Sequence, residues 1–119
     1  MYFFDTYAII ELILANPKYE PYADQGWIVS PLNVSELYLF FVRKYGRETA
    51  DSKLSGYNFK ILPISQNIAV ESAKYKLSRS KEKLSWADCI GYTLANHHSL
   101  KFLTGDAQFE NHQSVEFVK

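Results

Sequence analysis

The sequence predicts an α/β fold of three-layer α/β/α type, with a mostly parallel sheet of about five strands between two layers of helices. Three observations support this prediction. Short apolar segments alternate with longer amphipathic ones along the chain, which is typical of strands joined by helices. Helices of this length suit the crossovers that join parallel strands. Apolar residues make up 47% of the 119 residues, enough for a well-packed core. We expect residues 1–119 to form one domain.

Five segments are predicted to be strands because they are short, apolar and flanked by turn or helix-starting residues. They are residues 2–4, 27–29, 59–64, 102–103 and 115–118.

The helices are predicted from apolar spacing near the helical period and from stop signals. They are residues 6–15, 33–45, 47–55, 67–80 and 85–98, with a single turn at 106–109. Asn16-Pro17 ends the first helix, and Gly46 ends the second. The second helix is apolar around its whole circumference between Tyr38 and Val42. We therefore expect one face in the core and the other covered by a second copy of the chain, in a homodimer.

Composition narrows the class of protein. A single cysteine, Cys89, excludes an internal disulfide and favours a reducing cytoplasm. Asp5 and Glu11 interrupt the apolar N-terminal stretch and no basic residue precedes it, so it resembles neither a signal peptide nor a membrane span. The net charge is zero, with 13 basic and 13 acidic residues, whereas nucleic-acid binders usually have a basic excess. Acids gathered under a bound cation would leave the remaining surface mildly basic.

Four acidic residues stand where a predicted strand gives way to a helix, or in the first turn of that helix. Asp5 and Asp106 directly follow strands or short turns, whereas Glu36 and Asp88 lie just inside helices. In a parallel sheet these junctions share one edge, at the carboxyl ends of the strands, where open α/β sheets bind ligands. The four acids are therefore expected to converge.

The same four positions also suit helix capping. Asp and Glu in first turns meet free backbone N–H groups and the positive end of the helix dipole. The segments 33–36 and 85–88 have capping-box spacing, and Asp5 and Asp106 suit N-caps. A shared site is favoured by the number of acids on one edge and by the absence of nearby Lys or Arg residues to neutralise them. Uncompensated carboxylates repel one another, and oxygen-rich sites suit Mg²⁺ or Mn²⁺, which can activate water and stabilise phosphodiester charge.

Four segments in order then show a family resemblance: Phe3–Thr6, Asn33–Leu37, Leu84–Ile90 and, most diagnostic, Phe102–Asn111. Together they resemble PIN domains, particularly the toxin ribonucleases of VapC-type toxin–antitoxin modules, over essentially the whole chain. The resemblance implies a five-stranded parallel sheet and hydrolysis of RNA with Mg²⁺ or Mn²⁺. It also implies frequent homodimers and inhibition by a small antitoxin protein.

The resemblance assigns the catalytic positions to four acids, which are also the metal ligands, and to two hydroxyls. These residues are Asp5, Glu36, Asp88, Asp106, Thr6 and Thr104. The hydroxyls suit the holding of a metal-bound water or a neighbouring carboxylate. Two positions depart from the family pattern. Tyr7 stands where smaller residues are commoner and would narrow the pocket, and Gln108 replaces an acid that some relatives have, which would weaken the last metal contact.

The remaining polar residues have simpler interpretations. His97 and His98 are neighbours on one helix, so they point apart and are expected to close its C-terminus. His112 is expected in solvent, and Cys89 in the core as a small apolar residue rather than a nucleophile. Two basic groups are expected to face solvent, with contacts to RNA backbone as the alternative. They are Lys74, Lys76, Arg79, Lys81 and Lys83, and Arg43, Lys44 and Arg47.

Other functions fit an α/β fold with acids on one edge. A dehalogenase-like phosphotransferase needs Asp-x-Asp after the first strand, where this chain has Asp5-Thr-Tyr7. A receiver-like domain needs paired acids there and a lysine after a late strand, where this chain has Thr-Gly-Asp106. A PIN nuclease for RNA processing without an antitoxin, or a non-catalytic PIN domain that binds RNA or protein, remains an alternative. The leading hypothesis is a cytoplasmic, metal-dependent endoribonuclease with an antitoxin partner.

Overall fold

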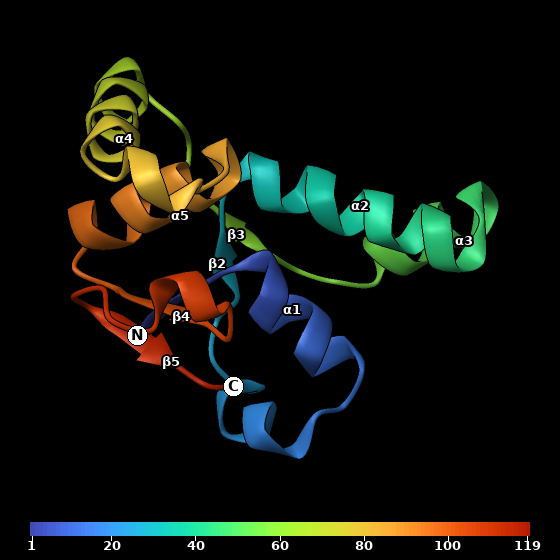
Figure 1. Ribbon diagram of the computed structural model, residues 1–119. Helices are drawn as coiled ribbons and strands as arrows, with labels where there is room; N and C mark the ends of the chain where they lie inside the picture. The colour runs from blue at the N-terminus through green and yellow to red at the C-terminus, as the bar shows by residue number, and fades with distance from the viewer.

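The computed structural model describes residues 1–119 and contains a five-stranded sheet in the order β3-β2-β1-β4-β5 (Figure 1). Every neighbouring pair of strands is parallel, so the predicted α/β class is confirmed. The strand order reverses between β1 and β4. The strands are β1 (Tyr2–Phe4), β2 (Ile28–Val29), β3 (Lys60–Ile61), β4 (Lys101–Thr104) and β5 (Val115–Phe117).

Five α-helices and three short 3₁₀ helices connect these strands. They are α1 (Thr6–Ile13), η1 (Pro17–Tyr22), α2 (Pro31–Tyr45), α3 (Arg47–Ser55), α4 (Gln66–Ser78), η2 (Ser80–Glu82), α5 (Trp86–His97) and η3 (Ala107–Phe109). The sequence did not predict η1. It also placed the start of α2 at residue 33, whereas Ser30 caps this helix and Pro31 is its first residue. Proline suits that first position because its missing N–H would have no partner there.

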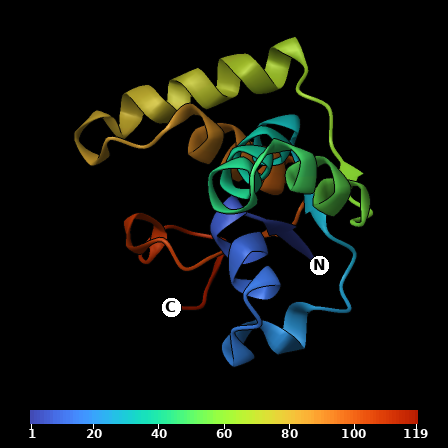
Figure 2. The ribbon, with the colours of Figure 1, turned by 90° about the vertical axis from the view of Figure 1, so that its right-hand side faces the viewer.

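The strands divide the core between the two faces of the sheet. Phe3, Ile28 and Phe102 belong to one cluster with residues of α4 and α5. The next residue of each strand, Phe4, Val29 or Leu103, belongs to a second cluster with α1, α2 and α3. This alternation follows from the two-residue repeat of a strand. Figure 2 shows α4 and α5 together on one side and α1 on the other, so the predicted three layers are confirmed.

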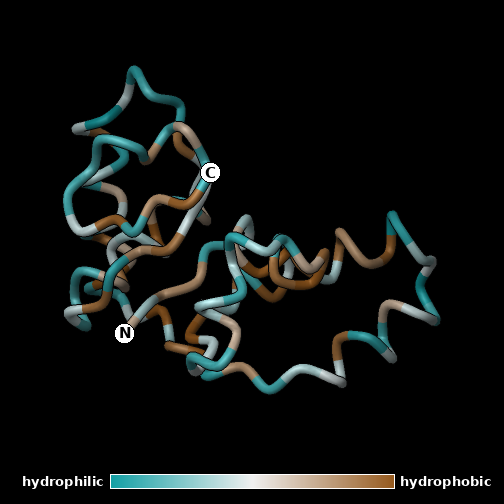
Figure 3. The backbone as a smooth tube through the Cα atoms, turned by 90° about the horizontal axis from the view of Figure 1, so that it is seen from below, coloured by the Kyte–Doolittle hydropathy of each residue, from teal (hydrophilic) through white to brown (hydrophobic).

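The β3 edge of the sheet is short and exposed. The sequence predicted a strand over residues 59–64, but only Lys60 and Ile61 pair with β2, and both are exposed. A short edge strand carrying a lysine discourages pairing with other chains. Figure 3 shows the hydrophobic stretches mainly inside the fold and the hydrophilic ones in its outer turns. No helix combines the length and the apolar character needed to cross a membrane.

One face of α2 enters the core of the protein, as the sequence predicted. Leu37 and Phe41 are fully buried, and the hydroxyl of Tyr38 donates to Asp51 Oδ1 on α3 at 2.6 Å. In Figure 1, α2 and α3 lie side by side and extend away from the sheet. Leu39 remains 46% exposed. The partner expected on the exposed face of this helix, and with it the homodimer, therefore stays a prediction.

Candidate active site

Asp5 stands at the carboxyl end of β1, where the strand order of the sheet reverses. Its Oδ1 accepts a hydrogen bond from the Thr6 backbone N at 2.9 Å, so Asp5 caps α1. Its Oδ2 accepts one from Thr104 Oγ1 at 2.7 Å, which ties the end of β1 to the end of β4. Open α/β sheets bind ligands at such reversal points. Asp5 therefore serves as a cap while occupying the position expected of a site residue.

The surroundings of Asp5 raise its pKa from an ordinary 3.8 to about 7. Burial is the main cause, because the residue is only 6% exposed. The negative charges of Asp88 and Glu36 raise the pKa further, while the hydrogen bonds from Thr104 and Thr6 act in the opposite direction. Because burial disfavours the charged form of this carboxyl group, a nearby cation would stabilise that form strongly.

Glu36 is oriented by a chain of hydrogen bonds that begins at the end of β2. Asn33 Oδ1 accepts from the backbone N and from Oγ of Ser30, both at 2.9 Å. Asn33 Nδ2 donates to Thr6 Oγ1 at 3.0 Å, and Thr6 Oγ1 donates to Glu36 Oε1 at 2.6 Å. Because Asn33 is buried, this chain of bonds is shielded from water. It fixes one carboxylate oxygen of an otherwise exposed residue.

The same contacts correct two expectations about α2. The capping box joins Ser30 and Asn33, not Asn33 and Glu36. Glu36 therefore lies in the second turn of α2, where it does not cap. Asn33 is a site residue that the sequence analysis missed. The sequence did contain a signal for it. Ser30 directly precedes Pro31, and Asn33 stands at the third helical position, where a polar side chain completes a capping box.

Asp88 combines the capping role with a place at the same edge of the sheet. Its Oδ2 accepts from the Ser85 backbone N, and its own N donates to Ser85 Oγ, both at 3.0 Å, so the predicted capping box is confirmed. Burial raises the pKa of Asp88, and the charge of Asp106 adds to this effect. The hydrogen bonds to Ser85 and the positive charge of Lys76 lower it.

Asp106 is placed by β4 through Thr104. Its backbone N donates to Thr104 Oγ1 at 3.0 Å, while the same hydroxyl donates to Asp5. Asp106 Oδ1 accepts from the Gln108 backbone N at 3.0 Å and so caps η3. One threonine hydroxyl thus sets the positions of two of the four acids relative to each other.

Gly105 is required between these two residues by close packing. A Cβ atom there would lie 2.3 Å from Cε1 of Tyr7 and 2.5 Å from the backbone O of Val118. The ring of Tyr7 could rotate, but the carbonyl belongs to the segment that follows β5. Any side chain at this position would therefore displace the backbone that carries Asp106.

The four acids converge on one cavity of about 650 Å³ between α1, α2 and the ends of β1 and β4. Its lining comprises Asp5, Thr6, Tyr7, Ile10, Glu36, Leu39, Phe40, Arg43, Lys44, Asp88 and Asp106. Thr104 is buried beneath it. Tyr7 borders the cavity, as expected for a residue that narrows it. No ion pair within 4.0 Å neutralises any of the four acids.

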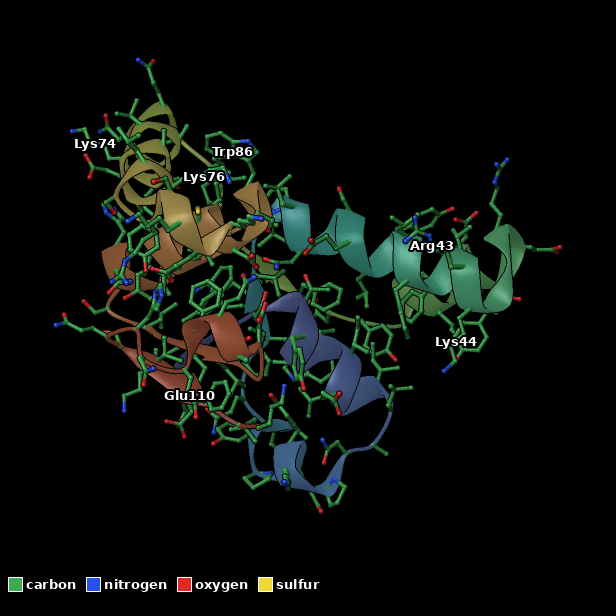
Figure 4. The ribbon with its side chains drawn as sticks, viewed as in Figure 1. Arg43, Lys44, Lys74, Lys76, Trp86 and Glu110 are labelled. Carbon is green, nitrogen blue, oxygen red and sulfur yellow. The ribbon has the colours of Figure 1, made fainter.

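Basic residues are nevertheless close to the acids, which the sequence analysis did not expect. Arg43 and Lys44, which both lie on α2 (Figure 4), line the cavity. The charge of Lys76 on α4 acts on Asp88. Arg43 and Lys44 border the cavity without pairing with its carboxylates. The result is an acidic floor with a basic wall, an arrangement able to hold a cation and a phosphate group next to each other.

The oxygen-rich lining has the chemistry that Mg²⁺ or Mn²⁺ prefers. No three Asp, Glu, His or Cys side chains are arranged so that they could already hold one ion. Burial, with a smaller contribution from neighbouring acids, raises the pKa of Asp5 and of Asp88, and a bound cation would stabilise their charged forms. The donor set therefore suits a divalent cation, whose binding would draw the carboxylates together.

His112 is buried, and the expectation that it faces solvent was wrong. It is 8% exposed, its Nε2 lies 2.6 Å from Glu82 Oε1, and its Nδ1 is hydrogen-bonded to the hydroxyl of Tyr75. Arg79 pairs with the other oxygen of Glu82 at 3.0 Å. The loop after η3 thus folds back against α4 and η2, through contacts between residues far apart in the sequence.

The other predicted positions are mixed in outcome. Cys89 is buried as expected, and burial raises the pKa of its thiol, which disfavours a nucleophilic role. His97 and His98 end α5 as expected. The basic run is not wholly solvated, because Lys76 is partly buried and donates a hydrogen bond to the backbone O of Leu84.

Comparison with known proteins places this arrangement in a family. The chain matches the PIN domain family model over residues 2–114, and no curated protein matches it. A toxin–antitoxin complex from Klebsiella pneumoniae is similar at 22% identity, covering 98% of this chain and 96% of that one, with a TM-score of 0.75. The sarcin–ricin loop cleaving toxin VapC20 of Mycobacterium tuberculosis is similar at 13% identity, with coverages of 99% and 97% and a TM-score of 0.79.

DNA-bound VapBC from Salmonella typhimurium is similar at 14% identity, covering 98% of this chain and 96% of that one, with a TM-score of 0.76. At these identities the solved structures establish a shared fold. The family model extends over nearly the whole chain, including all four acids of the cavity. The protein therefore belongs to the PIN-domain family.

Proposed function

We propose that the protein is a metal-dependent endoribonuclease that hydrolyses RNA phosphodiester bonds, and that it is the toxin of a toxin–antitoxin pair. The observation that carries this proposal is the cavity at the strand-order reversal, lined by four acids without ion-pair partners. The similar folds add support, since they include a toxin that cleaves the sarcin–ricin loop and several toxin–antitoxin complexes.

In this proposal Asp5, Asp88 and Asp106 hold Mg²⁺ or Mn²⁺, and Glu36 either joins them or orients the attacking water. The ion, when bound, supplies positive charge that acidifies water and stabilises the phosphodiester in the transition state. Thr104 holds Asp5 Oδ2 in place. Thr6 holds Glu36 Oε1, which leaves Oε2 available to accept a proton from water.

Hydrolysis then forms one bond between the water oxygen and phosphorus and breaks one phosphorus–oxygen ester bond. A carboxylate of the cavity receives the proton lost by the water, and the leaving oxygen gains a proton from solvent. Arg43 and Lys44 stand on the cavity wall, where their charges suit the RNA backbone.

The test is cleavage of labelled RNA with Mn²⁺ or Mg²⁺, beside a chelator control. We expect cleavage by the wild type, none in chelator, and none by Asp88→Asn. Asp24→Asn is the matched control because Asp24 is an exposed acid outside the cavity. Equal cleavage in chelator would exclude the metal mechanism. RNA binding by the wild type without cleavage would favour the alternative of a non-catalytic PIN domain.

The antitoxin and the homodimer are proposals with separate tests. A short neighbouring gene for a DNA-binding protein, whose product binds this chain and suppresses cleavage, would support the toxin assignment. Cleavage without such a partner would favour an RNA-processing nuclease instead. Light scattering decides the oligomeric state. Phe41→Glu is unsuitable as a dimer probe, because Phe41 is fully buried and its loss would unfold the core.

A further inference from the structure

Trp86 has a position that the proposed chemistry does not use. It is the first residue of α5, two residues before Asp88, and it is 53% exposed. Single exposed apolar residues are common and need no ligand. Trp86 differs because the ammonium of Lys76 lies 5.4 Å from the centroid of its ring. Figure 4 shows Lys76 beside Trp86 at the start of α5, while Lys74 extends away from them.

The backbone that carries Trp86 is fixed by several contacts. Lys76 donates a hydrogen bond to the backbone O of Leu84, whose side chain is buried. Just before it, Glu82 bonds both Arg79 and His112, which anchors η2 to α4 and to the loop after η3. The capping box of Ser85 then starts α5. An aromatic ring held this way loses little freedom when a flat partner stacks on it.

Lys76, whose ammonium lies over the Trp86 ring, also lines a positively charged hollow. This hollow of about 330 Å³ lies between α4 and the η2 segment and is lined by Lys76, Arg79 and Lys83, with no acidic residue. Arg79 and Lys76 already have partners, whereas Lys83 is exposed and forms no hydrogen bond or ion pair. An indole face beside free positive charge is the combination with which proteins bind single-stranded nucleic acid.

We propose that Trp86 is a stacking platform for an unpaired RNA base outside the acidic cavity, with the adjoining phosphate held at Lys83. The inference rests on the proposed function for the identity of the ligand as RNA. It adds a preference for unpaired RNA, which the acids of the cavity cannot supply. A base must be unstacked and unpaired to lie on Trp86, so the substrate is a single strand or a loop rather than a duplex.

Binding of a short fluorescein-labelled single-stranded RNA, measured by anisotropy in EDTA, tests this without any cleavage. We expect Trp86→Ala to weaken binding roughly 5- to 150-fold, the range for loss of one stacked base. Trp86→Phe should retain most of the affinity, because it keeps an aromatic face. An RNA abasic at the stacked position should bind the wild type and Trp86→Ala equally. Lys83→Ala should lower the slope of log affinity against log salt by about one.

Intrinsic fluorescence gives a second readout. Of the two tryptophans, Trp27 is half-buried and stacked with Phe4 and Tyr57. RNA should therefore quench the wild type but not Trp86→Phe. Unchanged RNA affinity in Trp86→Ala would overturn the platform and leave the nuclease proposal intact. A weaker Trp86→Ala beside a wild type that binds but does not cleave RNA would support the platform and remove the nuclease.

Discussion

The cluster around His112 and the acidic cavity shift the pKa values of their acids in opposite directions. Around His112, the carboxylate of Glu82 is bonded to the histidine and to Arg79, and the first of these contacts is the main reason its pKa is lowered. In the acidic cavity, Asp5 has no cationic partner, and burial raises its pKa to about 7. The first cluster balances its own charge, as structural ion pairs do. The second carries excess negative charge, which is typical of a binding site.

The largest expected effect separates these two regions by activity. Asp5→Asn should lower RNA cleavage in Mn²⁺ roughly a hundredfold or more, because several kcal/mol of transition-state stabilisation depends on the ion. Glu82→Gln should change the rate only through the fraction of protein that is folded. Initial rates at equal concentrations of folded protein provide the measurement. Comparable losses in both variants would contradict the distinction.

The next effect is a dependence of metal-free stability on pH. Because the folded pKa of Asp5 is about 7 against 3.8 for an ordinary aspartate, the folded state holds this proton more tightly. The contribution of Asp5 to stability is therefore complete below pH 3.8 and is lost as the pH rises to about 7, by roughly 4 kcal/mol at most. Asp5→Asn should lack this loss and be the more stable protein at pH 8.

Urea denaturation in EDTA at several pH values measures this effect. Asparagine retains the N-cap of α1, so the comparison isolates the charge. An Asp5→Asn protein that is less stable than wild type at pH 8 would show that Asp5 is mainly a structural acid.

In the His112 cluster, a substitution should lower stability rather than raise it. His112→Ala removes a buried ring and leaves Tyr75 and Glu82 without their partner, which should lower the free energy of unfolding by roughly 2–3 kcal/mol. Added Mn²⁺ should stabilise this variant as much as it stabilises the wild type, because the cavity is unchanged. Thermal melts with and without Mn²⁺ check both expectations. A loss of the Mn²⁺ effect would mean that the two regions are coupled.

The smallest expected effect distinguishes the capping role of Asp88 from its role in the acidic cavity. Ser85→Ala removes the hydroxyl of the capping box and should lower stability by about 1 kcal/mol, while stabilisation by Mn²⁺ is retained. Asp88→Asn should leave the metal-free protein at least as stable as wild type, because burial already disfavours its charge. It should reduce the stabilisation by Mn²⁺. If Asp88→Asn instead behaves like Ser85→Ala, Asp88 is only a cap.

Much of the fold was readable in the sequence because its strands and helices have distinct apolar spacing. All five strands and all five α-helices were predicted near their observed positions. Errors arose where contacts override local pattern. The segment around β3 has the pattern of a six-residue strand, yet only Lys60 and Ile61 form a strand at the sheet edge. Pro21 hides η1 from a search for helical spacing.

The candidate site was also predicted only in part. Its four acids were found because each follows or begins a regular element, a position visible in one dimension. Asn33 was missed because its importance comes from Thr6, a residue of another helix. His112 was misplaced because its polar neighbours in sequence suggest solvent, while its partners Tyr75 and Glu82 lie on or near α4.

The sequence alone determined the alternation of strands and helices and the placement of acids at their junctions, since both depend on neighbouring residues. Only the tertiary structure decided the strand order, with β1 between β2 and β4, which brings Asp5 and Thr104 within 2.7 Å. It also decided which charges are compensated. Burial and long-range contacts set the electrostatic cost of each carboxylate, so Glu82 is paired with Arg79, whereas burial raises the pKa of Asp5 and of Asp88.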